Sequence, residues 1–166
     1  GCMACMEKCH RNAITIKDDL KYYNALIDAE KCIDCGLCTK VCPRENDSDV
    51  SKPKWWYQGW ANPRIRESAS SGGAASAIIR TFIENGGYVA SCLFDGGKFI
   101  FEVTNEIEVA RKFAGSKYVK SNPEKIYGKI QSLLKEKQKV LFIGLPCQVA
   151  AVNQFIKDKT NLITAD

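Results

Sequence analysis

The spacing of the cysteines near the N-terminus constrains this chain more than any other feature. The chain contains nine cysteines, and seven of them lie in residues 1–50. Cys32, Cys35, Cys38 and Cys42 are separated by two, two and three residues, and Pro43 follows. This is the spacing of bacterial cysteine runs that bind 4Fe-4S clusters, in which the fourth cysteine ligates the other cluster of a pair. Zinc is the minor alternative, because zinc sites usually pair two Cys-x2-Cys knuckles across a longer insert.

A shorter cysteine run precedes this one. Cys2, Cys5 and Cys9 match the last three positions of a second run, whose first cysteine would fall three residues before Cys2. We therefore interpret the sequence as a fragment that is truncated at both ends. In the parent protein, cluster I would use the missing cysteine with Cys2, Cys5 and Cys42, and cluster II would use Cys9 with the first three cysteines of the longer run. With three ligands in the fragment, cluster I is expected to be absent or to be a three-iron cluster.

Residues 1–50 lack a long apolar periodicity, so we expect metal ligation, and not a large hydrophobic core, to order them. Residues 13–16 and 25–27 are predicted to be the two short strands of a ferredoxin-like sheet. His10, the only histidine, stands where such a run usually has proline and is interpreted as a surface residue beside the clusters. This N-terminal segment is the first of three predicted parts of the chain.

An aromatic and basic connector is predicted over residues 51–66, with a domain boundary near residue 52. It contains Trp55, Trp56, Tyr57 and Trp60. We predict that these side chains pack at the junction between two domains, with stacking on a planar cofactor as the alternative.

Residues 67–166 have the apolar patterns of an α/β domain. Helical spacing of apolar residues occurs at 75–83, 106–114, 126–134 and 149–155. Strand-like runs occur at 88–94, 99–103, 140–143 and 162–165, and Asp95-Gly96 predicts a hairpin turn. The last strand-helix-strand unit predicts parallel pairing. The predicted fold class is therefore an α+β ferredoxin-like 4Fe-4S segment followed by an α/β domain with a mixed, partly parallel sheet.

Three glycine-containing loops are candidates for a cofactor site. Ser71-Gly72-Gly73 directly precedes a predicted helix, whose first backbone N–H groups and dipole favour a phosphate, although a serine with glycines is also an ordinary helix start. The other two loops are Gly115-Ser116-Lys117-Tyr118-Val119 and Gly144-Leu145-Pro146-Cys147-Gln148. Cys147 is predicted in a first helical turn, where the helix dipole favours an anion. Cys92 lies within a predicted strand and is interpreted as a small buried apolar residue.

In this order behind the cysteine segment, the three loops resemble the coenzyme F-420 hydrogenase/dehydrogenase beta subunit family. The resemblance covers nearly the whole chain, with Leu145 where the family often has threonine and His10 in place of the usual proline. It implies an iron-sulfur flavoprotein oxidoreductase that contains two 4Fe-4S clusters and FAD. In such a protein the flavin converts one-electron traffic through the clusters into hydride exchange with a deazaflavin or related small acceptor.

The resemblance also implies a set of site residues. Cys147 is the candidate catalytic residue, and Lys117 is expected near the flavin or its phosphates. The seven implied cluster ligands are Cys2, Cys5, Cys9, Cys32, Cys35, Cys38 and Cys42. The implied flavin-binding positions are Ser71, Gly72, Gly73, Gly115, Ser116, Lys117, Tyr118, Gly144, Pro146, Cys147 and Gln148.

Two other functions fit the same sequence. In the first, the chain is a non-catalytic electron-transfer subunit that docks to a separate catalytic subunit, and it then needs no flavin. Alternatively, the α/β domain belongs to a transferase pathway and the clusters are structural or sense redox state. A fully reversible low-potential couple would argue against the second alternative.

Charge and hydropathy restrict the partners. The formal net charge is +5, and two clusters of about −2 each would bring the protein close to neutral, so the basic balance does not predict nucleic-acid binding. No apolar run approaches the roughly 20 residues of a membrane span, and the N-terminus lacks a signal-peptide pattern. We therefore expect a cytoplasmic protein whose partners are other redox subunits or a ferredoxin-type donor.

Overall fold

The computed structural model describes residues 1–19, 21–46 and 52–166. The N-terminal segment contains α1 (Ala4–Lys8), β1 (Ile14–Asp18), β2 (Tyr23–Ile27) and α2 (Leu37–Lys40). β1 and β2 pair antiparallel, with Ile14 opposite Ile27, which confirms the two predicted strands. α1 packs against α2 beneath this sheet, and the segment buries few side chains, among them Met3, Ala4 and Val41.

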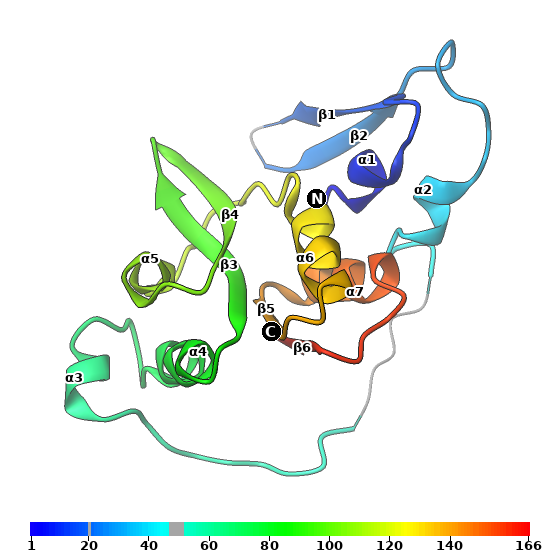
Figure 1. Ribbon diagram of the computed structural model, residues 1–166. Helices are drawn as coiled ribbons and strands as arrows, with labels where there is room; N and C mark the ends of the chain where they lie inside the picture. The colour runs from blue at the N-terminus through cyan, green and yellow to red at the C-terminus, as the bar shows by residue number, and fades with distance from the viewer. Residues whose placement is uncertain (20, 47–51) are drawn as a thin grey trace.

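The connector contains the short helix α3 (Pro63–Arg66), which Asn62 caps by accepting the Ile65 N–H at 3.1 Å. The prediction that its aromatic side chains pack at a domain junction is wrong. The relative exposures of Trp55, Trp56, Tyr57 and Trp60 are 75, 87, 89 and 72%. Residues 52–62 run along the outer edge of the molecule, opposite the N-terminal segment (Figure 1). The Ala61 N–H donates to the Gly72 carbonyl at 2.8 Å.

The second sheet has four strands in the order β4-β3-β5-β6. They are β3 (Tyr88–Asp95), β4 (Lys98–Thr104), β5 (Val140–Ile143) and β6 (Leu162–Ala165). β3 and β4 form the predicted hairpin, and β3, β5 and β6 run parallel to one another. The predicted mixed, partly parallel sheet is confirmed. The residues around Asp95-Gly96 turn with positive φ at Gly96 and Gly97.

Helices cover both faces of this sheet. On one face lie α4 (Ala74–Glu84), α5 (Ile107–Ala110) and a 3-10 turn at Arg111–Phe113. Ile79, Ile83 and Phe113 pack there against Val89 and Leu93. The prediction of one helix over 106–114 is wrong in its second half, because the tighter 3-10 turn places Phe113 in the core. Alternate residues of the strands point to the opposite face.

On that opposite face lie α6 (Ile126–Lys135) and α7 (Pro146–Phe155). The core here joins strand residues Ala90 and Phe142 to helix residues Ile130 and Val152. Ala4 and Val41 of the N-terminal segment belong to the same buried cluster. Figure 1 shows α1 lying beside α6 and α7. The iron-sulfur segment and the α6-α7 face of the sheet thus share one hydrophobic core.

Candidate iron-sulfur and cofactor site

Three of the predicted ligands form a group at the base of the N-terminal segment. Cys2 precedes α1, Cys5 lies within it, and Cys42 follows α2. Burial raises the pKa of the Cys2 and Cys5 thiols, and each is raised further by neighbouring thiolates, Cys42 acting on both. The structure therefore brings together the three cysteines that we assigned to cluster I, two from the first run and one from the second.

The two cysteine runs fold in the same local way. Cys2 is followed by Met3 in the left-handed conformation (φ 58°), after which α1 begins. Cys35 is followed by Gly36, also left-handed (φ 67°), after which α2 begins. Glycine adopts this conformation without steric cost, whereas Met3 adopts it while its side chain is 5% exposed. This repeated turn agrees with the proposed equivalence of the two runs.

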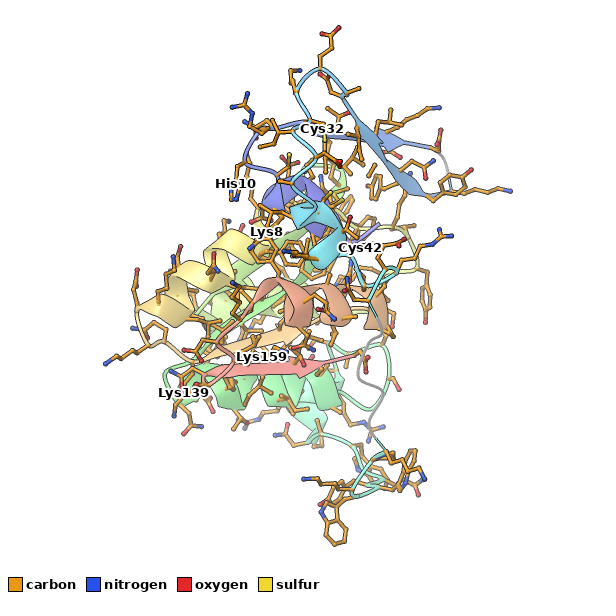
Figure 2. The ribbon with its side chains drawn as sticks, turned by 90° about the vertical axis from the view of Figure 1, so that its right-hand side faces the viewer. Lys8, His10, Cys32, Cys42, Lys139 and Lys159 are labelled. Atoms are coloured by element: carbon orange, nitrogen blue, oxygen red, sulfur yellow. The ribbon has the colours of Figure 1, made fainter. Side chains whose placement is uncertain are left out.

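Of the other four predicted ligands, two are exposed and two are half-buried. Cys32 and Cys35 are exposed, and Cys38 is half-buried. Cys9 is half-buried, and its Sγ accepts the Ala13 N–H at 3.3 Å. Figure 2 shows Cys32 at the outer end of the segment and Cys42 beside the helices. Cluster II is therefore predicted to face solvent, and cluster I to face the α/β domain.

The chemistry of these donors fits iron-sulfur clusters. Within the part of the chain that the structure describes, no three cysteine, histidine or acidic side chains are grouped closely enough to hold a single metal ion. A cluster of four irons separates its thiolate ligands more widely than one ion does. His10 is exposed, as expected for a surface residue.

The Glu7 side chain of α1 caps the start of α6 and so joins the N-terminal segment to the α/β domain. The Glu7 carboxylate accepts the backbone N–H groups of Tyr127, at 3.3 Å, and of Gly128, at the start of α6. A Cβ on Gly128 would lie 2.9 Å from Oε1 of Glu7, so a larger residue there would displace the end of the Glu7 side chain. Burial raises the pKa of Glu7, and the hydrogen bonds oppose that shift.

Tyr127 and Phe155 complete this contact. The buried Tyr127 hydroxyl donates to the Cys2 carbonyl, and burial raises the pKa of Tyr127 above its usual range. Its ring stacks on Phe155 of α7 at 5.2 Å, and Nζ of Lys8 lies 4.4 Å from the centre of the Phe155 ring. The hydrogen bonds of Glu7 and Tyr127 across this contact were not predicted, because their partners are 120–125 residues apart in the chain; Gly128 within a helical pattern was the one local signal.

Cys147 occupies the first turn of α7, as predicted, and is exposed. Its thiolate is among the neighbours that raise the pKa of Cys2 and of Tyr127. The candidate catalytic cysteine therefore lies at the cluster I end of the α/β domain, beyond the carboxyl end of β5. In sheets with parallel strands, this edge is where ligands usually bind.

Two of the three predicted flavin loops meet in space. The Ser116 N–H donates to Oγ of Ser70 at 2.9 Å. Gly73 (φ 76°) and Gly115 (φ 83°) both have the left-handed backbone that glycine permits. Together with the first turn of α4, these loops line a cavity of about 390 Å³, which we call the cradle, and Ser71 and Gly72 are part of its wall.

The third loop lies elsewhere, at the carboxyl ends of the parallel strands. Gln148 is buried; its Oε1 accepts the Leu145 N–H at 2.8 Å and its Nε2 donates to Oγ of Ser121 at 3.1 Å. The lining of the cradle comes from the first two loops. A ligand bound in the cradle would therefore contact Gly144, Pro146 and Gln148 only through a part that extends out of the cradle.

Lys117 points to the end of the 3-10 turn. Its ammonium donates to the carbonyls of Phe113 at 2.6 Å and Ala114 at 2.9 Å. Burial lowers the pKa of Lys117, and the nearby Cys92 thiolate opposes the shift. Cys92 is half-buried, where it was expected to be fully buried, and burial raises the pKa of its thiol. Lys117 and Cys92 thus lie near each other, with Cys92 in the middle of β3.

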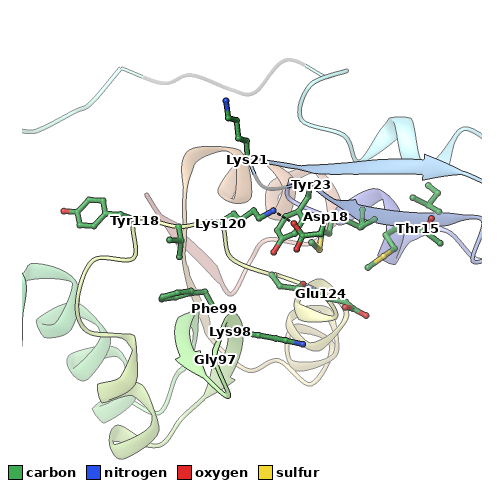
Figure 3. Close-up of a pocket in the computed structure, with 16 residues that line it drawn as sticks. Thr15, Asp18, Lys21, Tyr23, Gly97, Lys98, Phe99, Tyr118, Lys120 and Glu124 are labelled. Atoms are coloured by element: carbon green, nitrogen blue, oxygen red, sulfur yellow. Dashed lines mark hydrogen bonds and ion pairs between the residues drawn. The ribbon is translucent and has the colours of Figure 1, made fainter.

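A second and larger cavity separates the two-stranded sheet from the β3-β4 hairpin (Figure 3). We call it the interface cavity, and its volume is about 910 Å³. Its lining residues are Met3, Met6, Ile14, Thr15, Ile16, Asp18, Lys21, Tyr23, Gly97, Lys98, Phe99, Tyr118, Val119, Lys120, Asn122 and Glu124. Sequence patterns did not predict it, because its walls come from distant parts of the chain; only Tyr118 was among the candidate residues.

Comparison with known proteins supports the N-terminal assignment. Residues 1–46 match the 4Fe-4S dicluster domain family. The chain is also 26% identical over 152 residues to an uncharacterized protein of Methanocaldococcus jannaschii, an alignment that covers 82% of this chain and 42% of that protein. The chain thus spans less than half the length of the curated relative that it matches. The N-terminal segment is an iron-sulfur electron-transfer domain. Among the described residues, none of the helices has the length and apolar character needed to cross a membrane.

Proposed function

We propose that the protein is an iron-sulfur flavoprotein oxidoreductase that passes electrons between two 4Fe-4S clusters and a flavin. The flavin, when bound, would exchange hydride with a deazaflavin or related small acceptor, because a flavin handles both one-electron and hydride chemistry. One observation carries the proposal. Cys2, a predicted cluster I ligand, lies close enough to Cys147 for the two thiolates to interact, and Cys147 stands at the carboxyl end of the parallel strands, where cofactors usually bind.

The residues of the cradle suit the phosphates of FAD. Backbone N–H groups at the start of α4 and in the Gly115-Ser116 turn surround a space without an acidic side chain in its wall. Phosphate groups are favoured at such a helix start. Ser70, Ser71 and Ser116 add hydroxyl groups at the same place. These residues are proposed to bind and orient the cofactor, and Cys147 is proposed to lie near its reactive part.

The exposed end of the N-terminal segment is the place where we propose that electrons enter or leave the protein. Cys32 and Cys35 face solvent, whereas Cys2 and Cys5 are half-buried against the domain. We propose that electrons are exchanged with a ferredoxin-type donor or another redox subunit at the cluster II end, and that they reach the α/β domain through cluster I. We propose that the contact of Glu7 with α6 holds cluster I in place beside the α/β domain.

The electron-transfer subunit without a flavin is kept as a second candidate because of the connector. Trp55, Trp56 and Tyr57 are exposed. Exposed aromatic side chains are common at protein interfaces, so this segment suits docking to a catalytic subunit.

Cofactor content tests the proposal. The full-length protein is reconstituted without oxygen with iron, sulfide and FAD, and iron and flavin are measured after gel filtration. We expect about eight irons and one flavin per chain. Iron without flavin would contradict the flavoprotein and leave the electron-transfer subunit.

Paired serine variants locate the flavin. Ser70→Ala removes the hydroxyl that holds the Ser116 N–H and is expected to weaken FAD binding about tenfold. Ser68→Ala is the matched control, because the Ser68 hydroxyl donates only to the nearby Ile65 carbonyl, at 3.2 Å. Equal FAD affinities in the two variants would exclude the cradle as the FAD-binding site.

A further inference from the structure

The interface cavity is bounded on one side by residues next to the cluster I cysteines. Met3 follows Cys2 and Met6 follows Cys5, and both methionines line the cavity. Thioether sulfurs make favourable contacts with aromatic rings. A ring bound against these methionines would be separated from a cluster on Cys2 and Cys5 by only a few covalent bonds.

The facing walls are aromatic. Phe99 stands at the start of β4, where its ring contacts Phe94 at a centroid distance of 4.8 Å. Tyr118 is 93% exposed, at the mouth of the cavity. Tyr23 is held by Nζ of Lys120, which lies 4.5 Å from the centre of its ring. Figure 3 shows Phe99 and Tyr118 on one side and Tyr23 on the other. Flat walls of this kind accept a planar aromatic ring.

The walls are joined by a fixed ion pair. Lys120 contacts the Asp18 carboxylate and donates to the Asp19 carbonyl, so the loop after Tyr118 is tied to β1 of the N-terminal segment. This ion pair therefore joins the two sides of the cavity. A preformed site loses less conformational entropy when it binds.

Size and charge restrict the ligand. A volume of about 910 Å³ lies within the range of about 300–1,000 Å³ that is usual for small-molecule sites. The lining contains Lys21, Lys98 and Lys120 against Asp18 and Glu124. Since the lysines outnumber the carboxylates, a ligand with a negatively charged tail is favoured over a neutral one.

We propose that the interface cavity binds the planar aromatic ring of a redox ligand against the methionines that flank the cluster I cysteines. The proposal rests on the proposed function for its redox character. One loop joins the two sites, because Gly115 and Ser116 line the cradle and Tyr118 lines the interface cavity. The ring therefore belongs either to the FAD whose phosphates lie in the cradle or to a separate, diffusible aromatic carrier.

Riboflavin tests the cavity, because it has the aromatic ring without phosphate. It is titrated into the cluster-loaded full chain, and binding is followed by the loss of riboflavin fluorescence. Phe99→Ala is expected to weaken binding about tenfold. Phe94→Ala is the matched control: it removes the same Phe94–Phe99 contact, but Phe94 is outside the lining, so wild-type affinity is expected. Phe99→Leu, which keeps apolar volume without the ring, covers a folding failure of the alanine variant.

Repeating the titration with the FAD-loaded chain separates the two sources of the ring. Competition between riboflavin and FAD assigns the cavity to the flavin ring, and binding of riboflavin beside FAD assigns it to a diffusible carrier. Equal riboflavin affinities in Phe99→Leu, Phe94→Ala and wild type would overturn the proposal that the interface cavity binds the aromatic ring. A chain that binds Phe99-dependent riboflavin but no FAD would contradict the proposed function and leave the cavity intact.

Discussion

At the scale of single residues, Glu7 connects the two parts of the molecule. Its carboxylate accepts two backbone N–H groups at the start of α6 while its own helix carries Cys5. Hydrogen bonds from unpaired helix N–H groups to a carboxylate are stronger than those between neutral groups. Glu7, which lies between the predicted ligands Cys5 and Cys9, thus joins α1 to the start of α6.

Replacing this carboxylate tests that role. Glu7→Ala is expected to lower the free energy of unfolding by about 1–3 kcal/mol, because two partly buried N–H groups lose their acceptor. Denaturant unfolding measures it. Glu124→Ala is the control: this carboxylate is exposed and lies just before the same helix, so its loss is expected to change stability by less than about 0.5 kcal/mol. Equal effects of the two substitutions would contradict the contact.

Some residues could be assigned from sequence and others could not. The predicted cluster ligands follow from spacing along the chain, because both cysteine runs have the spacing of dicluster 4Fe-4S sites. The partners of Glu7, Tyr127 and Lys120 lie 101–125 residues away. No local pattern encodes such contacts. Lys117 was expected near the flavin or its phosphates, but its ammonium donates to the Phe113 and Ala114 carbonyls, which the 3-10 turn brings within reach.

At the scale of elements, the strands and the long helices follow from apolar periodicity. α4, α6 and α7 begin within a few residues of their predicted starts, because each has one apolar face against the sheet. The connector was predicted wrongly for a physical reason. A high content of aromatic residues favours burial, but only a complementary surface within the chain can provide it, and Trp56 and Tyr57 are exposed.

The contact of α1 with α7 should carry much of the coupling between the iron-sulfur segment and the sheet. Phe155 is 5% exposed, stacks on Tyr127 and lies beneath Lys8. Phe155→Ala is expected to cost about 3–5 kcal/mol of unfolding free energy, which thermal or denaturant unfolding measures. Phe94→Ala, at a ring that is 55% exposed, should cost less than about 1 kcal/mol. A small loss in Phe155→Ala would mean that the two parts are only loosely joined.

At the scale of the whole molecule, the exposure of the cysteines decreases from the outer end of the N-terminal segment toward the α/β domain. Exposed thiols at Cys32 and Cys35 lie at one end, and half-buried thiols at Cys2 and Cys5 lie against the domain that carries the cradle and the interface cavity. Single electrons entering at cluster II would reach cluster I before any cofactor. This order could not be predicted from sequence, because it depends on which end of the segment shares a core with α6 and α7.

The most direct test of this account is the rate at which a reduced ferredoxin reduces the bound flavin in a chain that has lost cluster I. Cys42→Ser removes a predicted ligand of cluster I, and Cys92→Ser is the control, since Cys92 lies in β3 outside both cysteine runs. Stopped-flow absorbance at the flavin band measures the rate, and iron content confirms the loss of one cluster. We predict a small fraction of the wild-type rate in Cys42→Ser and a normal rate in Cys92→Ser. An unchanged rate in Cys42→Ser, with the iron of cluster I gone, would contradict the path through cluster I.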